Sequence, residues 1–555
     1  MLTPQNFIAP VCLTAVTLFG VWAIAMYFRF SKTSSGKLVD TEFFLTARKT
    51  QEWHMIAYGF FATSVGSGVI FGPASYVLGG GGVIGLACYA FFAGFPLIIV
   101  ARMGTVIQAR FATPMSLGSF AKWRFGHMFH LYVVFNVFIN LGIALAVEYT
   151  SIGALFKEYL NTPVWVPILV VGLVTMAYTI AGGLYVSILT DGVQSIVILL
   201  LVAFMTFYLS ITFRPTFLPV IPEQLGVTYM GWSSIATLGI ALPSSTIFSD
   251  AVWQRVWAAK DDASLQIGAC VGAALTITVT FLFAFAGYLA GRAGMVDFNN
   301  IAEVNTGFFA ILKDQTTHVI PFGILTIVCI LAATLNESAV DSFQNAILDT
   351  LISGLVSTGY KVPLSTARIL VVCLNIPLMI LGTQGLSIIQ LYLLANLLTT
   401  TTVLPLTLGL FKCFDRYVSG TAALFGCAFS ILSIFILGAS KYRDYTKLTW
   451  LSYFKGMSRG ISEFFFLSYQ WEPFVLALLA SLVGVFLYVS GEYFLWRTLR
   501  LFYRCNGWKL TGGLVDHPWP AFDPECFDDV LGHHHVPESS ASEHSHDDGY
   551  FINHN

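Results

Sequence analysis

Charge is scarce in this chain of 555 residues: Asp, Glu, Lys and Arg together make up 10% of it. Soluble domains carry about 25% charged residues, so a soluble globular protein is excluded. Apolar residues make up 56% and the mean hydropathy is +0.74, whereas a disordered chain needs low hydrophobicity. The sequence therefore predicts an all-α integral membrane protein, because helices satisfy their own backbone groups in lipid.

Metal-binding and catalytic motifs are also missing. The nine Cys are scattered without a CxxC spacing, which argues against a disulfide framework or a zinc site. We find no HExxH, phosphate loop or GxSxG elbow, so an enzyme is the least expected class. No basic stripe alternates with aromatic residues, so a nucleic-acid partner is not expected.

Long apolar segments are what the chain has instead. A membrane-spanning helix needs about 20 such residues, and thirteen segments qualify within a few residues at each boundary. The predicted spans are 7–30, 53–77, 83–103, 129–150, 164–181, 186–212, 233–257, 265–290, 320–355, 366–381, 386–410, 421–437 and 474–496. No cleavage site follows the first of them, which we interpret as an anchor rather than a cleaved signal.

The distribution of Lys and Arg predicts the orientation. With the N-terminus outside, 19 of the 28 basic residues lie in cytoplasmic segments, as the positive-inside rule requires. The plasma membrane is the default location for such a protein. The predicted divisions are a first helix with a cytoplasmic loop, a core of ten spans, accessory helices and a cytoplasmic tail. Their ranges are 1–52, 53–411, 412–496 and 497–555.

The tail is acidic. Residues 510–555 hold nine carboxylates and no Lys or Arg, so removing them from the net charge of −2 leaves +7 on the rest of the chain. The tail also contains seven histidines, of which His533, His534, His535, His544 and His546 lie among the last carboxylates. A solvated, disordered segment is the expectation, and a metal-binding patch is the alternative.

The second predicted span contains Gly66, Gly68, Gly72 and Pro73 near its middle. Because proline removes a backbone donor and clashes with the preceding turn, this cluster predicts a broken helix. A kinked helix with close glycine packing is the alternative. Irregular backbone at membrane depth occurs only beside a cavity or other protein, so carbonyl groups in residues 60–63 would become available to a cation.

The seventh predicted span repeats this pattern five spans later, with Pro243 followed by a polar cluster that ends at Asp250. Two interrupted helices at this spacing are typical of inverted-repeat transporters. We expect repeats at about 53–212 and 233–411. Each has five spans, so the second crosses the membrane in the opposite sense.

The ninth predicted span is the most polar. Glu337, Asp341, Asn345 and Asp349 follow one another at intervals of four and share one helix face. Buried carboxylates are costly unless they are paired, protonated or bound to a cation, which makes Glu337 and Asp341 coupling candidates. Alternatively the end of this helix, Asp349 above all, lies beyond the bilayer. Asp191, at the start of the sixth span, is either interfacial or faces the ninth span.

Two stretches resemble the sodium/solute symporter family. Residues 178–194 (YTIAGGLYVSILTDGVQ) are similar to its G-G-L-x-x-x-x-x-T-D-x-x-Q pattern, and residues 253–260 (WQRVWAAK) are similar to its Q-R-x-x-A-A-K loop. The resemblance covers about residues 40–415, which is the transport core. The stretch SDAVWQR at 249–255 is similar to the urea- and polyamine-transporting branch.

This resemblance implies a LeuT-type core of five plus five helices in inverted repeat, and uptake driven by a cation gradient. It implies a principal sodium site made of backbone carbonyls and hydroxyls on the second and ninth spans. The matching positions are Phe60, Thr63, Ile330, Ala333 and Thr334. Ala333 departs from the family, which has two adjacent hydroxyls at the last two places.

A second sodium site, present in some members, matches Asp191 and positions near Asn336 and Glu337. Here Glu337 is acidic where hydroxyls are usual. A protonatable Glu337 would make the protein a proton-coupled carrier, so sodium and a proton both stay open as coupling ions. Sodium is the only metal expected, and no other cofactor is.

The predicted function is cation-coupled symport of a small polar solute, urea or a polyamine, by alternating access within a lipid bilayer. The polar candidates for the solute site are Ser64, Ser67, Ser245, Thr246 and Asp250. Asp250 suits either solute, or is a helix-end charge near the cytoplasm. A transporter-like nutrient sensor is the alternative function, and a channel is disfavoured because tetrameric filter sequences are absent.

Overall fold

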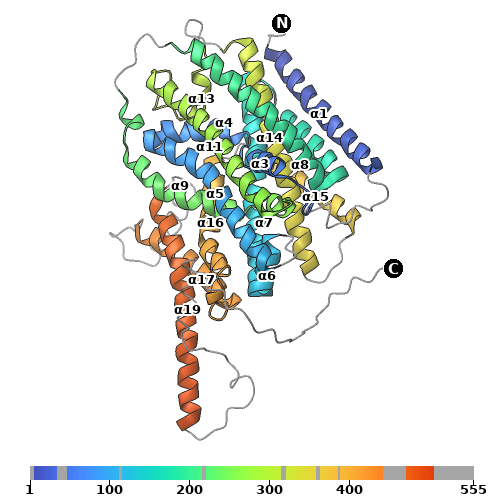
Figure 1. Ribbon diagram of the computed structural model, residues 1–555. Helices are drawn as coiled ribbons and strands as arrows, with labels where there is room; N and C mark the ends of the chain where they lie inside the picture. Colours follow the sequence, from blue (N-terminus) through green and yellow to red (C-terminus); the bar gives the residue numbers. More distant parts are fainter. Residues whose placement is uncertain are drawn as a thin grey trace.

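The computed structural model describes residues 5–33, 47–111, 116–214, 221–313, 320–357, 363–384, 388–441 and 470–505. Within these ranges the framework is helical, and the strand-like pairing is one isolated bridge between Gln51 and Ala259. The helices form a bundle with α1 (Gln5–Thr33) on its outside, while α19 (Trp471–Cys505) extends away from it (Figure 1). The histidine-containing part of the predicted tail lies outside the described residues.

The other long helices follow one another along the chain and contact neighbours that are distant in sequence. They are α3 (Trp53–Ser64), α4 (Gly68–Tyr76), α5 (Gly82–Arg110), α6 (Leu117–Phe125), α7 (His127–Leu160), α8 (Trp165–Thr212), α9 (Tyr229–Ile247), α10 (Asp250–Ala258), α11 (Asp262–Arg292), α14 (Phe322–Ser357), α15 (Leu364–Gly382), α16 (Ile388–Leu408) and α17 (Gly420–Lys441). A π-helix (Val77–Gly81) joins α4 to α5.

Each of the thirteen predicted spans falls on one or two of these helices. Helix α8 carries two of them, joined at Gly183, whose φ of 57° favours glycine. Nine helical stretches of the described residues are long and apolar enough to cross a membrane, and α15 and α16 add shorter apolar stretches. The prediction of an all-helical integral membrane protein is confirmed.

Both predicted interruptions are present. Helix α3 ends at Ser64 and α4 begins at Gly68, so residues 65–67 leave the helical path. Helix α9 ends at Ile247 and α10 begins at Asp250. The prolines do not mark the breaks, however, because Pro73 lies inside α4 and Pro243 inside α9. The attribution of the first break to Pro73 is therefore wrong in position.

Helix α11 supports the first interrupted helix through a stripe of small residues. A Cβ atom at Gly272 would lie 2.9 Å from the Ala57 carbonyl oxygen of α3, and one at Gly287 would lie 2.6 Å from the Ala74 Cβ of α4. Close backbone approach through glycine is a common way for membrane helices to associate. Outside the apolar stretch, Asp261 caps α11 by accepting a hydrogen bond from the Ser264 N–H at 2.7 Å, which lowers the pKa of its carboxyl.

We predict that Gly272→Ala lowers the melting temperature of the purified protein in detergent by several degrees. The added methyl group would meet the backbone of α3, and overpacking costs about 1–3 kcal/mol. Gly323→Ala is the matched control, because a Cβ atom there meets nothing within 4 Å. Equal melting temperatures for the two variants would contradict the close packing of α3 on α11.

Candidate functional site

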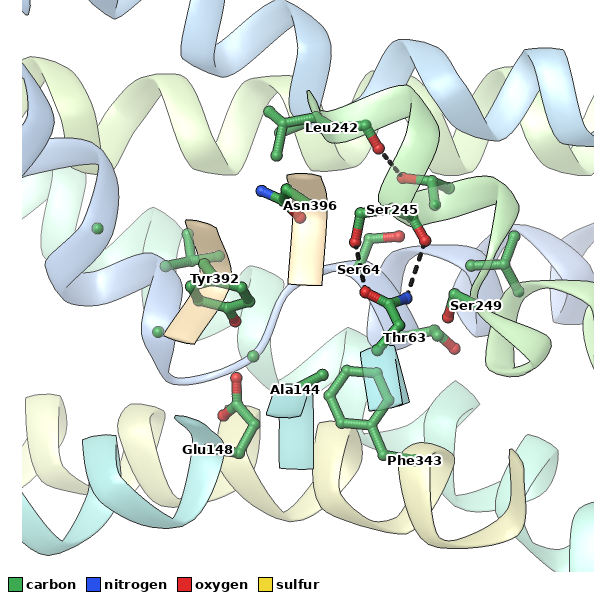
Figure 2. A pocket seen from close by; sticks show the side chains of 18 of the residues that line it. Thr63, Ser64, Ala144, Glu148, Leu242, Ser245, Ser249, Phe343, Tyr392 and Asn396 are labelled. Carbon is green, nitrogen blue, oxygen red and sulfur yellow. Dashed lines mark hydrogen bonds between the residues drawn. The ribbon is translucent and has the colours of Figure 1, made fainter. Parts of the chain in front are cut away.

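A cavity of about 200 Å³ lies where the two interrupted helices meet α7. Residues from both breaks reach it, together with side chains from α5, α14 and α16 (Figure 2). Its polar lining includes Thr63, Ser64, Tyr76, Tyr89, Asn140, Glu148, Ser245, Thr246, Ser249, Thr280, Tyr392 and Asn396. Glu148 is the single carboxylate among the described lining residues, and Lys, Arg and His are absent from them.

Glu148 of α7 binds the first interruption. Its Oε2 atom accepts hydrogen bonds from the Ser67 N–H at 2.8 Å, the Ser67 hydroxyl at 2.7 Å and the Asn336 amide at 3.1 Å. The carboxylate thus caps the start of α4, where unsatisfied N–H groups favour negative charge. The side chain is 2% exposed.

Asn140 of α7 serves the second interruption. Its amide group donates to the carbonyls of Ser245 at 3.0 Å and Phe248 at 3.1 Å, and its oxygen accepts from the Ser245 hydroxyl at 3.0 Å (Figure 2). These bonds occupy carbonyl groups that the end of α9 leaves without helical partners. One helix therefore supplies a polar side chain to each break.

The predicted solute-site residues separate into two groups. Ser64, Ser245 and Thr246 line the cavity. Ser67 instead binds Glu148, and Asp250 is fully buried outside the lining. Asp250 accepts a hydrogen bond from the Leu117 N–H at 3.1 Å and one from the Thr350 hydroxyl at 2.6 Å, so its carboxylate holds α6 and α14 to the second break.

The residues of the predicted principal cation site lie on two helices in mutual contact, α3 and α14. The Thr334 hydroxyl donates to the Ile330 carbonyl at 2.9 Å, and the Thr63 hydroxyl donates to the Gly59 carbonyl at 2.7 Å. Thr63 also lines the cavity, while Phe60 and Ala333 are buried. Cation binding by these groups stays a prediction.

Asp191 faces the interior of the bundle, where it contacts α14, the helix of the ninth predicted span. This is one of the two positions predicted for it. Its Oδ2 forms an ion pair with Arg255 at 2.6 Å, and both side chains are fully buried. Arg255 also donates to the Ser342 hydroxyl at 2.7 Å, and Asp191 accepts from Ser338 at 3.1 Å. The pair therefore joins α10, α8 and α14 across the second break.

The carboxylate ladder of α14 is buried throughout, including Asp349 at 0% exposure. Asp341 accepts hydrogen bonds from Thr179 at 2.8 Å and Asn345 at 2.9 Å. Glu337 faces Gln194, but its Oε1 atom makes no hydrogen bond within the described residues. Those residues hold no cluster of three or more His, Cys, Asp or Glu placed to bind a metal ion.

Glu148, Asn140 and Arg255 were not among the predicted site residues. A signal for the first two exists, since they are eight residues apart in an apolar segment and so project from nearly one face of α7. Their polarity at membrane depth was as costly as that of the ninth span. Arg255 was quoted only as part of a loop motif, because its partner Asp191 is 64 residues away.

Comparisons with known proteins find similarity to transporters. No family model matches it. It is 24% identical over 497 residues to the spermidine transporter DUR31 of Candida albicans. The alignment covers 87% of this chain and 89% of that protein. It is 26% identical over 290 residues to a sodium/glucose cotransporter of Vibrio parahaemolyticus, covering 47% of this chain and 51% of the relative.

A solved structure shares the fold. The substrate-bound outward-open state of a sodium-coupled sialic acid symporter aligns with a TM-score of 0.60 and 15% identity, over 87% of this chain and 97% of that one. The curated relatives confirm the resemblance to the sodium/solute symporter family, and they are transporters rather than enzymes.

We predict that Arg255→Met destabilises the protein by about 3–5 kcal/mol, because it leaves the Asp191 carboxylate buried without its counter-charge. Thermal unfolding in detergent would measure the loss. Adding Asp191→Asn to Arg255→Met should recover part of the stability, since no unpaired charge then remains. A double variant less stable than Arg255→Met alone would contradict this account of the pair.

Proposed function

We propose that this relative of the sodium/solute symporters is a cation-coupled secondary active transporter of a small polar solute, with a polyamine as the solute and urea as the runner-up. The observation that carries the proposal is the cavity itself, which lies at both helix breaks and whose described lining residues include one carboxylate and no basic side chain. Such a lining attracts a cation. The similarity to a spermidine transporter supports the same choice.

The proposed architecture has thirteen spans, of which ten form two inverted repeats of a LeuT-type core. The first repeat, about 53–212, begins with α3–α4, and the second, about 233–411, begins with α9–α10. Support comes from the equivalent place of the two breaks, each at the start of its repeat. The segments 1–52, 412–496 and 497–555 would be an anchor with its loop, accessory helices and a cytoplasmic tail.

For the coupling ion we propose sodium at the α3–α14 site, with backbone carbonyls of Phe60, Thr63 and Ile330 and the hydroxyl of Thr334 as ligands. Ala333 contributes no hydroxyl, so this site has fewer ligands than the family pattern. A second sodium on Asp191 is disfavoured, because Arg255 already neutralises that carboxylate. Glu337 is the acid that would carry a proton in the alternative mechanism.

In this mechanism the cation favours one state of the carrier because it binds that state more tightly. Solute enters the cavity from one side, and movement of the helices around the breaks exposes it to the other. We place the protein in the plasma membrane with the N-terminus outside and the C-terminus in the cytoplasm, from the basic residues of its loops. The solute, the coupling ion and lipid are the proposed partners.

We predict that the purified protein in liposomes accumulates labelled spermidine when an inward sodium gradient is imposed, and accumulates urea poorly. Protein-free liposomes and a sodium ionophore provide the controls. Accumulation under a proton gradient alone, lost in Glu337→Gln, would instead make Glu337 the coupling acid. Heat stabilisation by spermidine without any uptake would favour a nutrient sensor and overturn the transport proposal.

We also predict that Thr334→Ala raises the sodium concentration for half-maximal uptake about tenfold, the effect of losing about 1.4 kcal/mol from one ligand. Thr326→Ala is a matched control on the same helix, because its exposed hydroxyl makes the same type of bond, to the Phe322 carbonyl at 2.9 Å. A sodium dependence that is equal in both variants would remove Thr334 from the site.

A further inference from the structure

We infer that Glu148 is the carboxylate that recognises the solute, and that its Oε1 atom binds a primary ammonium group. The inference rests on the proposed function and specifies which side chain selects the solute. Glu148 belongs neither to the predicted cation site nor to the predicted solute site. Its candidacy comes from its burial, its hydrogen bonds and the space around one of its two oxygens.

When its carboxyl is ionised, Glu148 has no counter-charge among the described side chains. No Lys, Arg or His of the described residues lies within ion-pair distance of it. This contrasts with Asp191, which is equally buried and is paired with Arg255. A buried charge is unfavourable unless it is paired. A cation that enters the cavity would form an ion pair with the Glu148 carboxylate.

The two carboxylate oxygens have different surroundings. Oε2 already accepts three hydrogen bonds, from two Ser67 groups and Asn336. Oε1 lies against Gly66 so closely that a Cβ atom there would overlap it. A Cβ atom at Gly68 would be 3.6 Å from both Oε1 and the Tyr392 hydroxyl. Glycine at position 66 therefore lets the carboxylate pack directly against the backbone of the first break, with Oε1 on the side where Tyr392 lines the cavity.

The rest of the cavity suits an organic ammonium better than a metal ion. Its volume of about 200 Å³ is several times the roughly 30 Å³ that one water occupies in the liquid. Aromatic rings of Tyr89, Tyr392 and Phe343 line it, and such rings attract cations through their faces. These features fit an alkyl chain with an ammonium group at its end.

A second acceptor in the cavity makes no hydrogen bond within the described residues. Asn396 of α16 is 1% exposed, lines the cavity, and its Oδ1 atom has no hydrogen-bond partner among the described residues. Figure 2 shows Glu148 and Asn396 entering the cavity from different sides. An acceptor without a donor is costly when buried. A second N–H group of the same solute, apart from the ammonium on Glu148, would satisfy it, as a linear diamine or polyamine can.

The test is equilibrium binding of labelled spermidine to the purified protein, with Glu148→Gln as the main variant. Glutamine keeps the shape and can still cap α4, but it removes the charge. We expect the affinity for spermidine to fall about 10- to 100-fold, the range for losing a hydrogen bond to a charged group. Glu158→Gln, on the exposed surface of the same helix, removes the same charge and should leave the affinity unchanged.

A second pair of variants keeps the carboxylate and alters only its space. Gly66→Ala should also weaken spermidine binding, because its methyl group takes the place of Oε1, whereas Gly79→Ala should not, because a Cβ atom there meets nothing within 4 Å. Melting temperatures of all variants would separate loss of binding from loss of folding.

Three results distinguish this inference from the proposed function. Unchanged spermidine affinity in a folded Glu148→Gln variant overturns the role of Glu148 and leaves polyamine transport standing. Loss of sodium affinity with spermidine affinity retained also overturns it, since Glu148 would then be a metal ligand. Binding of putrescine but not spermidine, lost in Glu148→Gln, supports the ammonium site while spermidine itself is discarded as the solute.

Discussion

Backbone groups that leave a helix at membrane depth must find new partners, because lipid offers none. The two helix breaks of this protein meet that requirement through side chains of α7. Glu148 accepts the N–H of Ser67 at the start of α4, and Asn140 donates to carbonyls of Ser245 and Phe248 at the end of α9. The cavity exists because the chain departs from helical geometry there. These contacts satisfy backbone groups that the breaks leave without helical partners.

Most of the buried charged groups discussed above likewise have partners within the protein. Asp191 and Arg255 neutralise each other, and Asp250 accepts from the backbone of Leu117 and the hydroxyl of Thr350. These groups lie between helices and hold them together. Glu148 differs because it borders the cavity and forms no ion pair within the described residues, so its carboxylate, when ionised, would attract a cation into the lining.

Much of the fold was predictable from the sequence, because each long apolar segment predicts a helix from its local composition alone. No knowledge of contacts with other parts of the chain is needed. The glycines and polar residues around Ser67 and Ser249 also predicted where helices break. The exact breakpoints were not predictable from proline, since Pro73 and Pro243 fit inside α4 and α9. There, side-chain partners on α7 decide where the helix stops.

The candidate site was less predictable, because it depends on pairings between distant residues. Ser64, Ser245 and Thr246 were identified as polar residues beside the breaks, and the structure places them at the cavity. Asp250 is also a polar residue beside a predicted break, but its carboxylate accepts a hydrogen bond from Thr350 outside the cavity lining. The polarity of Glu148 within an apolar segment is visible in the sequence, but its role is not, because its partners Ser67 and Asn336 are 81 and 188 residues away.

The position of Asn140 and Glu148 on one helix has a mechanical consequence. Eight residues of α-helix separate them, a distance of about 12 Å along the axis, and each is bonded to a different helix break. A tilt of α7 would thus strain both attachments at once, so the two breaks could not change position independently. In a carrier of the proposed kind, this linkage would suppress half-open states, through which ions would leak without carrying solute.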